Sequence, residues 1–154
     1  MSQETIEINL TPQELQVLSD LDSRQFGFLK LSTPEQAKKK ALVVKAVKYL
    51  ERMLIQAQEE KDDIDGIHSK EISIDPKTYC KLGHFHLLLE DYAKAMSAYQ
   101  KYFNLRSDYW KDACFLYGQG LVYFHFNAFQ WSQILNDFHI FQEKNCSIHD
   151  DVQA

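Results

Sequence analysis

Few residues in this 154-residue chain interrupt helices. It contains only five glycines and three prolines, whereas a fold of many short strands needs frequent turn residues. No segment alternates apolar and polar residues with period two for long enough to predict a strand. With 45% hydrophobic and 13% aromatic residues, the chain has enough apolar surface to offset the entropy lost on folding. The composition therefore argues against extensive disorder and predicts an all-α fold.

Basic residues are also too few and too scattered for a nucleic-acid-binding surface. The chain has 17 Lys and Arg against 22 Asp and Glu, a formal net charge of −5. Binding to a duplex needs a positive stripe that displaces counterions. The one basic cluster, Lys38-Lys39-Lys40, is best interpreted as the solvated face of a helix. We expect protein partners and no direct binding of nucleic acid.

Cysteines are few and widely separated. Cys80, Cys114 and Cys146 form no CxxC pair, and no secretory signal pattern precedes the acidic start of the chain. This usage indicates a reducing intracellular compartment. We expect the thiols to lie in the core rather than to bind a metal.

Residues 113–136 contain no charged side chain, and about 20 apolar residues suffice to span a membrane. Many polar residues within this segment would be costly in lipid: Gln119, His125, Asn127, Gln130, Ser132, Gln133 and Asn136. The segment therefore predicts a buried or partner-facing helical hairpin and no membrane association.

Threonine–proline and aspartate–proline pairs mark the expected helix starts. Thr11-Pro12-Gln13-Glu14 predicts a capping box and a short helix to about Leu21. Thr33-Pro34 repeats this pattern before a long amphipathic helix. Asp75-Pro76 opens the next helix, and Asp91 is expected to cap the one after it. The long helix carries one apolar stripe with helical spacing: Val43, Ala46, Val47, Leu50, Met53, Leu54 and Ala57.

Six residues match the spacing of the tetratricopeptide repeat: Tyr79, Leu82, Gly83, His86, Ala95 and Tyr99. Gly83 and Ala95 are small, so the two helices of a hairpin can approach closely, and the aromatic residues fill the adjacent gaps. The chain is therefore expected to form tetratricopeptide-type helix hairpins, a short α-solenoid.

A second copy of the repeat is expected 37 residues further along. Leu116, Gly120 and Tyr123 take the positions of Tyr79, Gly83 and His86, and Ser132 takes the small-residue position. Asn136 departs from the pattern where a large apolar residue is needed. The first helix of this copy is apolar on two faces, which predicts a position between neighbouring helices: Trp110, Ala113, Cys114, Tyr117, Leu121 and Phe124 on one, and Leu116, Gly120 and Tyr123 on the other.

These signals divide the chain into five segments. Residues 1–10 are expected to be a flexible N-terminus, and residues 11–61 to form helices that pack on the repeats. An acidic loop follows at 62–74. The two hairpins occupy 75–142, the second one atypical, and 143–154 form a flexible tail. An array of only two hairpins leaves an uncovered end face, so we expect a marginally stable protein with an adhesive C-terminal face.

Several stretches closely resemble the first repeats of the UTX/UTY-type histone H3 lysine demethylases. They are Leu82-Gly83-His84-Phe85 through Glu90-Asp91-Tyr92, Ala95-Met96-Ser97-Ala98-Tyr99-Gln100, Ser107-Asp108-Tyr109-Trp110-Lys111 and Phe115 to Trp131. The segment Leu21 to Phe28 resembles the region that precedes those repeats. The resemblance covers roughly residues 11 to 131, and residues 132–154 do not resemble the next repeat helix.

The resemblance implies a nuclear, chromatin-associated protein. In that family the repeats bind proteins of a COMPASS-like histone-methyltransferase co-activator complex. A separate Jumonji domain uses Fe(II) and 2-oxoglutarate to demethylate a histone H3 lysine, and this chain has no counterpart of that domain. No Fe(II), 2-oxoglutarate or catalytic residue is therefore carried over to it.

The residues themselves give no constellation for catalysis or metal binding. His84 and His86 lie two positions apart on a helix and point about 200° apart around its axis. His125 is expected to be a packed core residue. His139 and His149 lie in the segment that matches no pattern, where His149-Asp150 suggests half of an iron motif but has no third ligand. Glu90-Asp91 is explained by helix capping rather than acid–base chemistry.

Three functions remain open from the sequence. The first is a non-catalytic interaction module from the N-terminus of a UTX-type chromatin regulator. The second is a fragment of a full-length Fe(II)/2-oxoglutarate-dependent demethylase that acts in transcriptional activation. The third is an independent small helical adaptor. We expect no enzymatic activity from this chain on its own.

Overall fold

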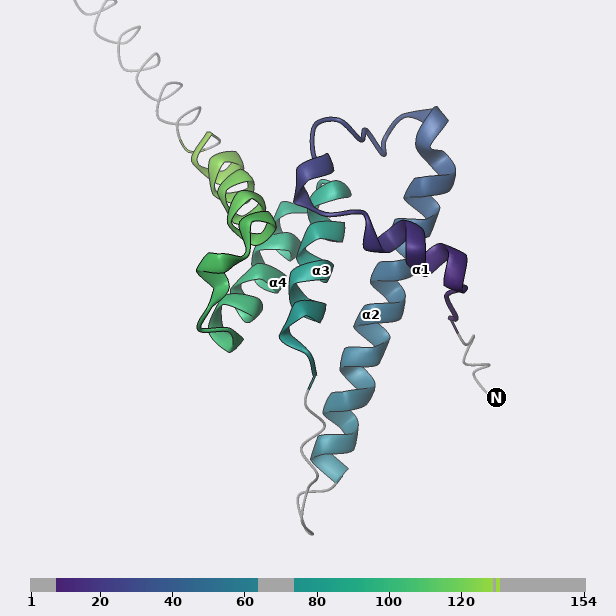
Figure 1. Cartoon of the computed structure of the whole chain (residues 1–154), viewed down its shortest axis with the longest axis vertical. Helices are drawn as coiled ribbons and strands as arrows, with labels where there is room; N and C mark the ends of the chain where they lie inside the picture. Colours follow the sequence, from purple (N-terminus) through teal and green to yellow (C-terminus); the bar gives the residue numbers. More distant parts are fainter. Residues whose placement is uncertain (1–7, 64–73, 129, 131–154) are drawn as a thin grey trace, which may run out of the picture. The chain divides into compact units, whose positions relative to one another are not determined.

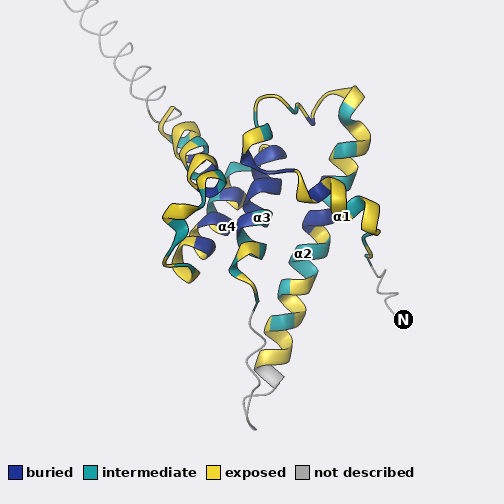
Figure 2. Ribbon diagram, viewed as in Figure 1, coloured by how far each residue is buried: buried dark blue, intermediate teal, exposed yellow. Residues whose placement is uncertain are grey.

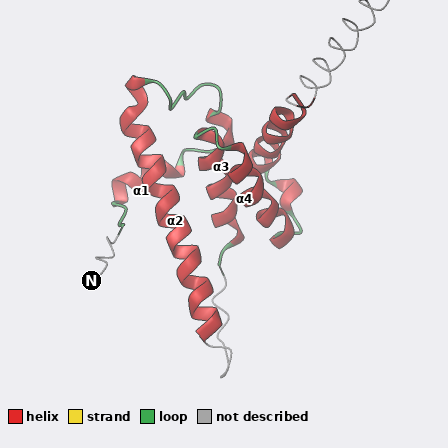
Figure 3. Cartoon of the chain, turned by 180° about the vertical axis from the view of Figure 1, so that it is seen from behind, coloured by secondary structure: helices red, strands yellow, loops and turns green. Residues whose placement is uncertain are grey.

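The computed structural model describes residues 8–63, 74–128 and 130. Its regular elements over these residues are all helical (Figure 3), so the predicted all-α class is confirmed for them. The chain divides into two compact units, 1–119 and 120–154. Four α-helices of the first unit are labelled in Figure 1: α1 (Pro12–Ser19), α2 (Ala37–Asp63), α3 (Pro76–Leu88) and α4 (Tyr92–Leu105). Short 3-10 turns lie at Ser23–Gln25, Pro34–Gln36 and Tyr109–Lys111, and residues 113–128 are helical.

Most of the predicted helix starts are confirmed. The Thr11 hydroxyl accepts from the Glu14 amide and the Glu14 carboxylate accepts from the Thr11 amide, both at 3.2 Å, which completes the capping box. Asp75 and Asp91 each accept a backbone amide within the first turn of α3 and α4. Thr33 differs, because its hydroxyl donates back to Lys30 and a 3-10 turn precedes α2.

The turn between α3 and α4 fixes these two helices as a hairpin. After α3, the Glu90 amide donates to the Leu87 carbonyl and the Asp91 amide donates to the His86 carbonyl, both at 2.9 Å. Glu90 has a positive φ of 61°. This combination is a Schellman motif, which satisfies the last carbonyls of a helix and reverses the chain. Asp91 then caps α4 at once, so the helices lie side by side (Figure 1).

Tyr99 on α4 occupies the tightest part of the hairpin and is 1% exposed. A Cβ atom on Gly83 would lie 2.5 Å from two ring carbons of Tyr99, closer than atoms can approach. A Cβ atom on Gly118 would also overlap the Tyr99 side chain, near its hydroxyl group. The Tyr99 ring therefore needs glycine on α3 and again on the helix that follows.

A second apolar cluster joins the N-terminal segment to the hairpin. Burial is highest along α3 and where it meets α2 (Figure 2). The buried members of this cluster come from α1, the loops that follow it, α2, α3 and α4: Leu18, Leu21, Leu31, Val43, Ala46, Val47, Leu82, Phe85, Leu88 and Ala98. Only the first half of the α2 stripe enters the cluster fully, because Met53 is 36% exposed.

Some boundaries and faces differ from the prediction. α1 ends at Ser19 rather than about Leu21, and α2 continues to Asp63, so the first two residues of the expected 62–74 loop are helical. Trp110 lies in a 3-10 turn and is 62% exposed, so the third predicted helix does not begin there. Its buried positions are Phe115, Gly118 and Val122, a stripe that neither predicted face contains.

The expected flexible tail at 143–154, Cys146, His139, His149 and residues 131–142 of the second hairpin lie outside the described residues. No helix in the described part of the chain is long and apolar enough to cross a membrane.

The packing around Tyr99 gives a first prediction. Gly83→Ala should lower the free energy of unfolding by about 1–3 kcal/mol, because the added methyl group overlaps a buried ring with no room to move. Urea denaturation of the full chain measures the change. Gly120→Ala is the matched control, since it is also helical and a Cβ there meets nothing within 4 Å.

The control should be unchanged, or more stable by up to about 1 kcal/mol from the better helix propensity of alanine. A Gly83→Ala variant as stable as the wild type would show that α3 and α4 are not in close contact. A loss at Gly120 would indicate the close approach that the second repeat copy requires.

Candidate functional site

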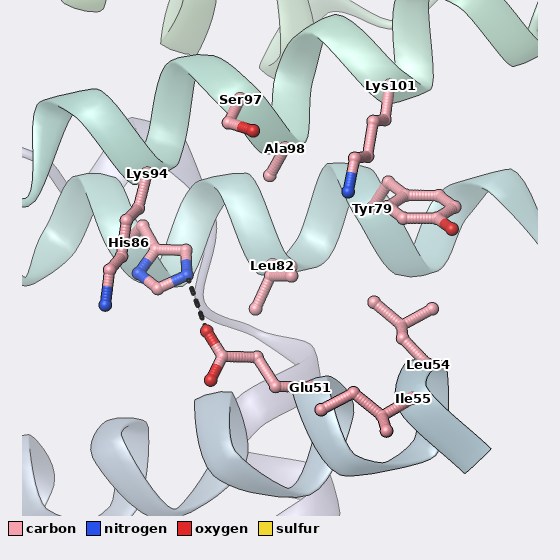
Figure 4. A pocket seen from close by; sticks show the side chains of 10 residues that line it. All are labelled: Glu51, Leu54, Ile55, Tyr79, Leu82, His86, Lys94, Ser97, Ala98 and Lys101. Carbon is pink, nitrogen blue, oxygen red and sulfur yellow. Dashed lines mark ion pairs between the residues drawn. The ribbon is translucent and has the colours of Figure 1, made fainter. Parts of the chain in front are cut away.

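A groove lies between α2, α3 and α4 (Figure 4). Its volume is about 350 Å³. The lining residues come from α2 (Glu51, Leu54, Ile55), from α3 (Tyr79, Leu82, His86) and from α4 (Lys94, Ser97, Ala98, Lys101). All of these elements belong to the first compact unit.

The floor of the groove is apolar. Leu54 and Ile55 of α2 line it together with Leu82 of α3 and Ala98 of α4, and the Ile55 side chain lies along α2 (Figure 4). Ile55 is 59% exposed. Contiguous apolar groups that are exposed and rimmed by polar residues are a feature of surfaces that bind a partner.

Helix lengths explain why this floor is open. α2 has 27 residues and α3 has 13. At 1.5 Å per residue these lengths are about 40 Å and about 20 Å. α3 therefore covers only part of the apolar stripe of α2, and Met53, Leu54 and Ala57 are less buried among the described residues than Val43, Ala46 and Val47.

His86 and Glu51 form a polar contact across the groove. His86 Nε2 lies 3.4 Å from Glu51 Oε1 (Figure 4). The His86 side chain is only 6% exposed, whereas that of Glu51 is 42% exposed. Burial lowers the pKa of His86, and the nearby Glu51 carboxylate partly opposes that shift. The imidazole is therefore mostly neutral at physiological pH.

The α4 wall is cationic. Lys94, Ser97 and Lys101 follow one another at i, i+3 and i+7, which places them on one helix face. Lys94 Nζ lies 4.0 Å from Asp91 Oδ2, in a contact between two well-exposed side chains. Lys101 Nζ lies 5.6 Å from the centre of the Tyr79 ring. Both ammonium groups border the apolar floor.

The predicted signature residues fall into three groups. Tyr79, Leu82 and His86 line the groove. Gly83, Ala95 and Tyr99 are buried, and Gly83 and Tyr99 form the close contact of the hairpin. The positions of the second copy are different: Leu116, Gly120 and Tyr123 are exposed. Ser132 lies outside the described residues, as does the segment that would pack against Gly120.

A buried polar network lies on the other side of α3. His84 Nδ1 is 2.7 Å from the Tyr99 hydroxyl, and His84 Nε2 is 3.4 Å from Cys80 Sγ. Asp112 accepts from the Tyr102 hydroxyl at 3.1 Å and lies 3.8 Å from Cys80 Sγ. Burial raises the pKa of Cys80, so its thiol stays protonated and is a poor nucleophile. These contacts hold α3, α4 and the turn before residue 113 together.

His84 thus lies in the buried network and His86 in the groove, as their helical spacing predicts. Over the described ranges, no three His, Cys, Asp or Glu side chains are grouped so that they could hold a metal ion. Asp91 caps α4 and Glu90 occupies the reverse turn, so these two carboxylates do not form an acid–base pair. His125 is exposed, contrary to the core position expected for it.

Sequence reasoning did not identify Glu51, Ile55, Lys94 and Lys101 as site residues. The seven-residue spacing of the two lysines is visible in the sequence, but it becomes informative only when α2 is known to face α4 across α3. No protein-family model and no solved structure matches this chain.

The polar network gives a pH prediction. Burial lowers the pKa of His84 from 6.5 to about 4, with Lys81 adding to the shift and Asp22 and Asp112 opposing it. Between these two values the unfolded chain binds the proton more readily, so the contribution of neutral His84 to stability is present above pH 6.5 and is lost as the pH falls toward 4. The loss is about 3 kcal/mol for the full shift.

Urea denaturation between pH 7 and pH 4 tests this dependence. The His84→Gln variant should be less stable at pH 7 but should show a shallower decline toward pH 4 than the wild type. Parallel declines in His84→Gln and the wild type would contradict a buried, neutral His84.

Proposed function

We propose that this chain is a protein-interaction module that holds a short segment of a partner protein in the groove between α2, α3 and α4. The observation that carries the proposal is the apolar floor of the groove, which is buried at Leu82 and Ala98 and exposed at Ile55, and which is bordered by charged groups on two walls. Binding sites commonly combine an apolar floor with a few polar groups that fix orientation, in volumes from about 300 Å³.

We also propose that α3 and α4 form one tetratricopeptide-type hairpin. The spacing of Tyr79, Leu82, Gly83, Ala95 and Tyr99 supports this assignment. So does the packing of the Tyr99 ring against Gly83, since small residues at these positions serve close helix pairing. In such arrays, paired helices present a continuous binding surface.

The resemblance to UTX/UTY-type demethylases suggests the setting of this interaction. Under this proposal the module acts in the nucleus, and its partners are subunits of a COMPASS-like co-activator complex. In that family Fe(II) and 2-oxoglutarate bind to the Jumonji domain. We do not assign the binding of either to the groove residues. A fragment of a longer demethylase and an independent adaptor are alternative settings for the same groove.

Site-specific photocrosslinking in cells tests the binding function. Benzoylphenylalanine in place of Ser97 puts the photoreactive group in the groove. Benzoylphenylalanine in place of Gln100 is the matched control. Both positions are exposed on α4, and only Ser97 lines the groove. We expect Ser97 to crosslink to one defined segment of a partner and Gln100 to give no such product. Mass spectrometry of the crosslinked peptides identifies that segment.

The variant Ile55→Ser links the crosslink to the groove floor. Because Ile55 is largely exposed, the fold should tolerate this change, while the crosslink from Ser97 should decrease several-fold. Equal crosslinking from Ser97 and Gln100, unaffected by Ile55→Ser, would show that the groove is not the binding surface. Crosslinks to subunits of a histone-methyltransferase complex would support the nuclear setting, and crosslinks confined to unrelated proteins would count against it.

A further inference from the structure

The two walls of the groove differ in charge. The α4 wall carries the ammonium groups of Lys94 and Lys101 with the Ser97 hydroxyl between them (Figure 4). The α2 wall carries the Glu51 carboxylate, which is already engaged by His86 at 3.4 Å. The positive wall also contrasts with the formal net charge of −5 of the whole chain. Such a local reversal of sign favours a ligand with negative charge.

Lys94 and Lys101 can each give up their present contact and pair with a negatively charged ligand instead. Lys94 is 4.0 Å from Asp91, and both side chains are substantially exposed, at 65% and 42%. Exposed pairs of this kind contribute little to stability. Lys101 lies over the Tyr79 ring at 5.6 Å, where a carboxylate could join the ammonium group without displacing a buried bond. Both lysines are therefore accessible to a ligand.

The spacing of the lysines sets the spacing of the ligand's charges. Seven residues of helix separate their Cα atoms by about 10 Å along the axis of α4. A peptide in the extended polyproline II conformation rises about 3.1 Å per residue with three residues per turn, so side chains three positions apart lie on the same face, about 9 Å from each other. Ala98 lies between the two lysines in the sequence of α4 and lines the groove together with Leu54, Ile55 and Leu82.

We propose that the groove binds an extended acidic segment in which two carboxylates, three residues apart, pair with Lys94 and Lys101 while an apolar side chain between them contacts the floor. The inference rests on the proposed function and specifies the chemistry of the partner. Glu51 on the facing wall sets the orientation, since it disfavours a carboxylate on that side.

Selection from a phage library of random 12-residue peptides tests the inference with the full chain as the immobilised target. Enriched peptides should contain Asp or Glu at positions i and i+3 with an aliphatic or aromatic residue between them. A synthetic peptide with the selected sequence should bind about tenfold more tightly than its Gln isostere. That preference should diminish as the salt concentration rises.

Two double variants separate the groove from general electrostatics. Lys94→Gln with Lys101→Gln should remove the preference for the acidic peptide over its Gln isostere. Lys38→Gln with Lys40→Gln changes the net charge equally at two exposed positions outside the groove, and should leave the preference intact.

The outcomes distinguish the inference from the proposed function. Enriched peptides without acidic residues, whose binding is lost in Ile55→Ser, would overturn the inference and leave a peptide-binding groove. No enrichment above a blank surface would overturn both. An acidic preference that survives Lys94→Gln with Lys101→Gln would overturn the inference by placing the anionic contact elsewhere.

Discussion

The Tyr99 ring lies where α3 and α4 approach Phe115 and Gly118, and the close packing of the α3–α4 hairpin depends on that contact. Glycine is required at 83 and at 118 because a Cβ at either position would overlap the Tyr99 side chain. The ring also packs edge-on against Phe115, with centroids 5.6 Å apart, and its hydroxyl pairs with His84. One aromatic side chain thus sets the distance between three helices and satisfies a buried imidazole.

This contact fixes one side of α3 and leaves the other side free to build the groove. Cys80 and His84 face the network around Tyr99, while Tyr79, Leu82 and His86 face α2 and the cationic wall of α4. Because α2 is twice as long as α3, part of its apolar stripe is not covered by α3. The groove therefore follows from a mismatch in helix length on a hairpin of fixed geometry.

The sequence predicted the helices well because their signals are local. Caps at Thr11, Asp75 and Asp91 depend on hydrogen bonds within one turn, and all three formed as expected. Gly83 and Tyr99, which the repeat spacing singled out, are both buried. The groove could not be predicted in the same way, since Ile55 and Lys101 meet only through the packing of three helices. Periodicity also misplaced the buried stripe after residue 112, because a segment apolar on every side gives no preferred face.

Hydrogen exchange of the full chain, followed by mass spectrometry, tests most directly whether the Tyr99 contact organises the first unit. If it does, amides of α3 and α4 should exchange most slowly among the described residues, and those in the C-terminal half of α2, beyond the shared core, should exchange much faster. Exchange in α3 and α4 as fast as at the end of α2 would contradict the account, because the hairpin would then not be the stable element on which the groove is built.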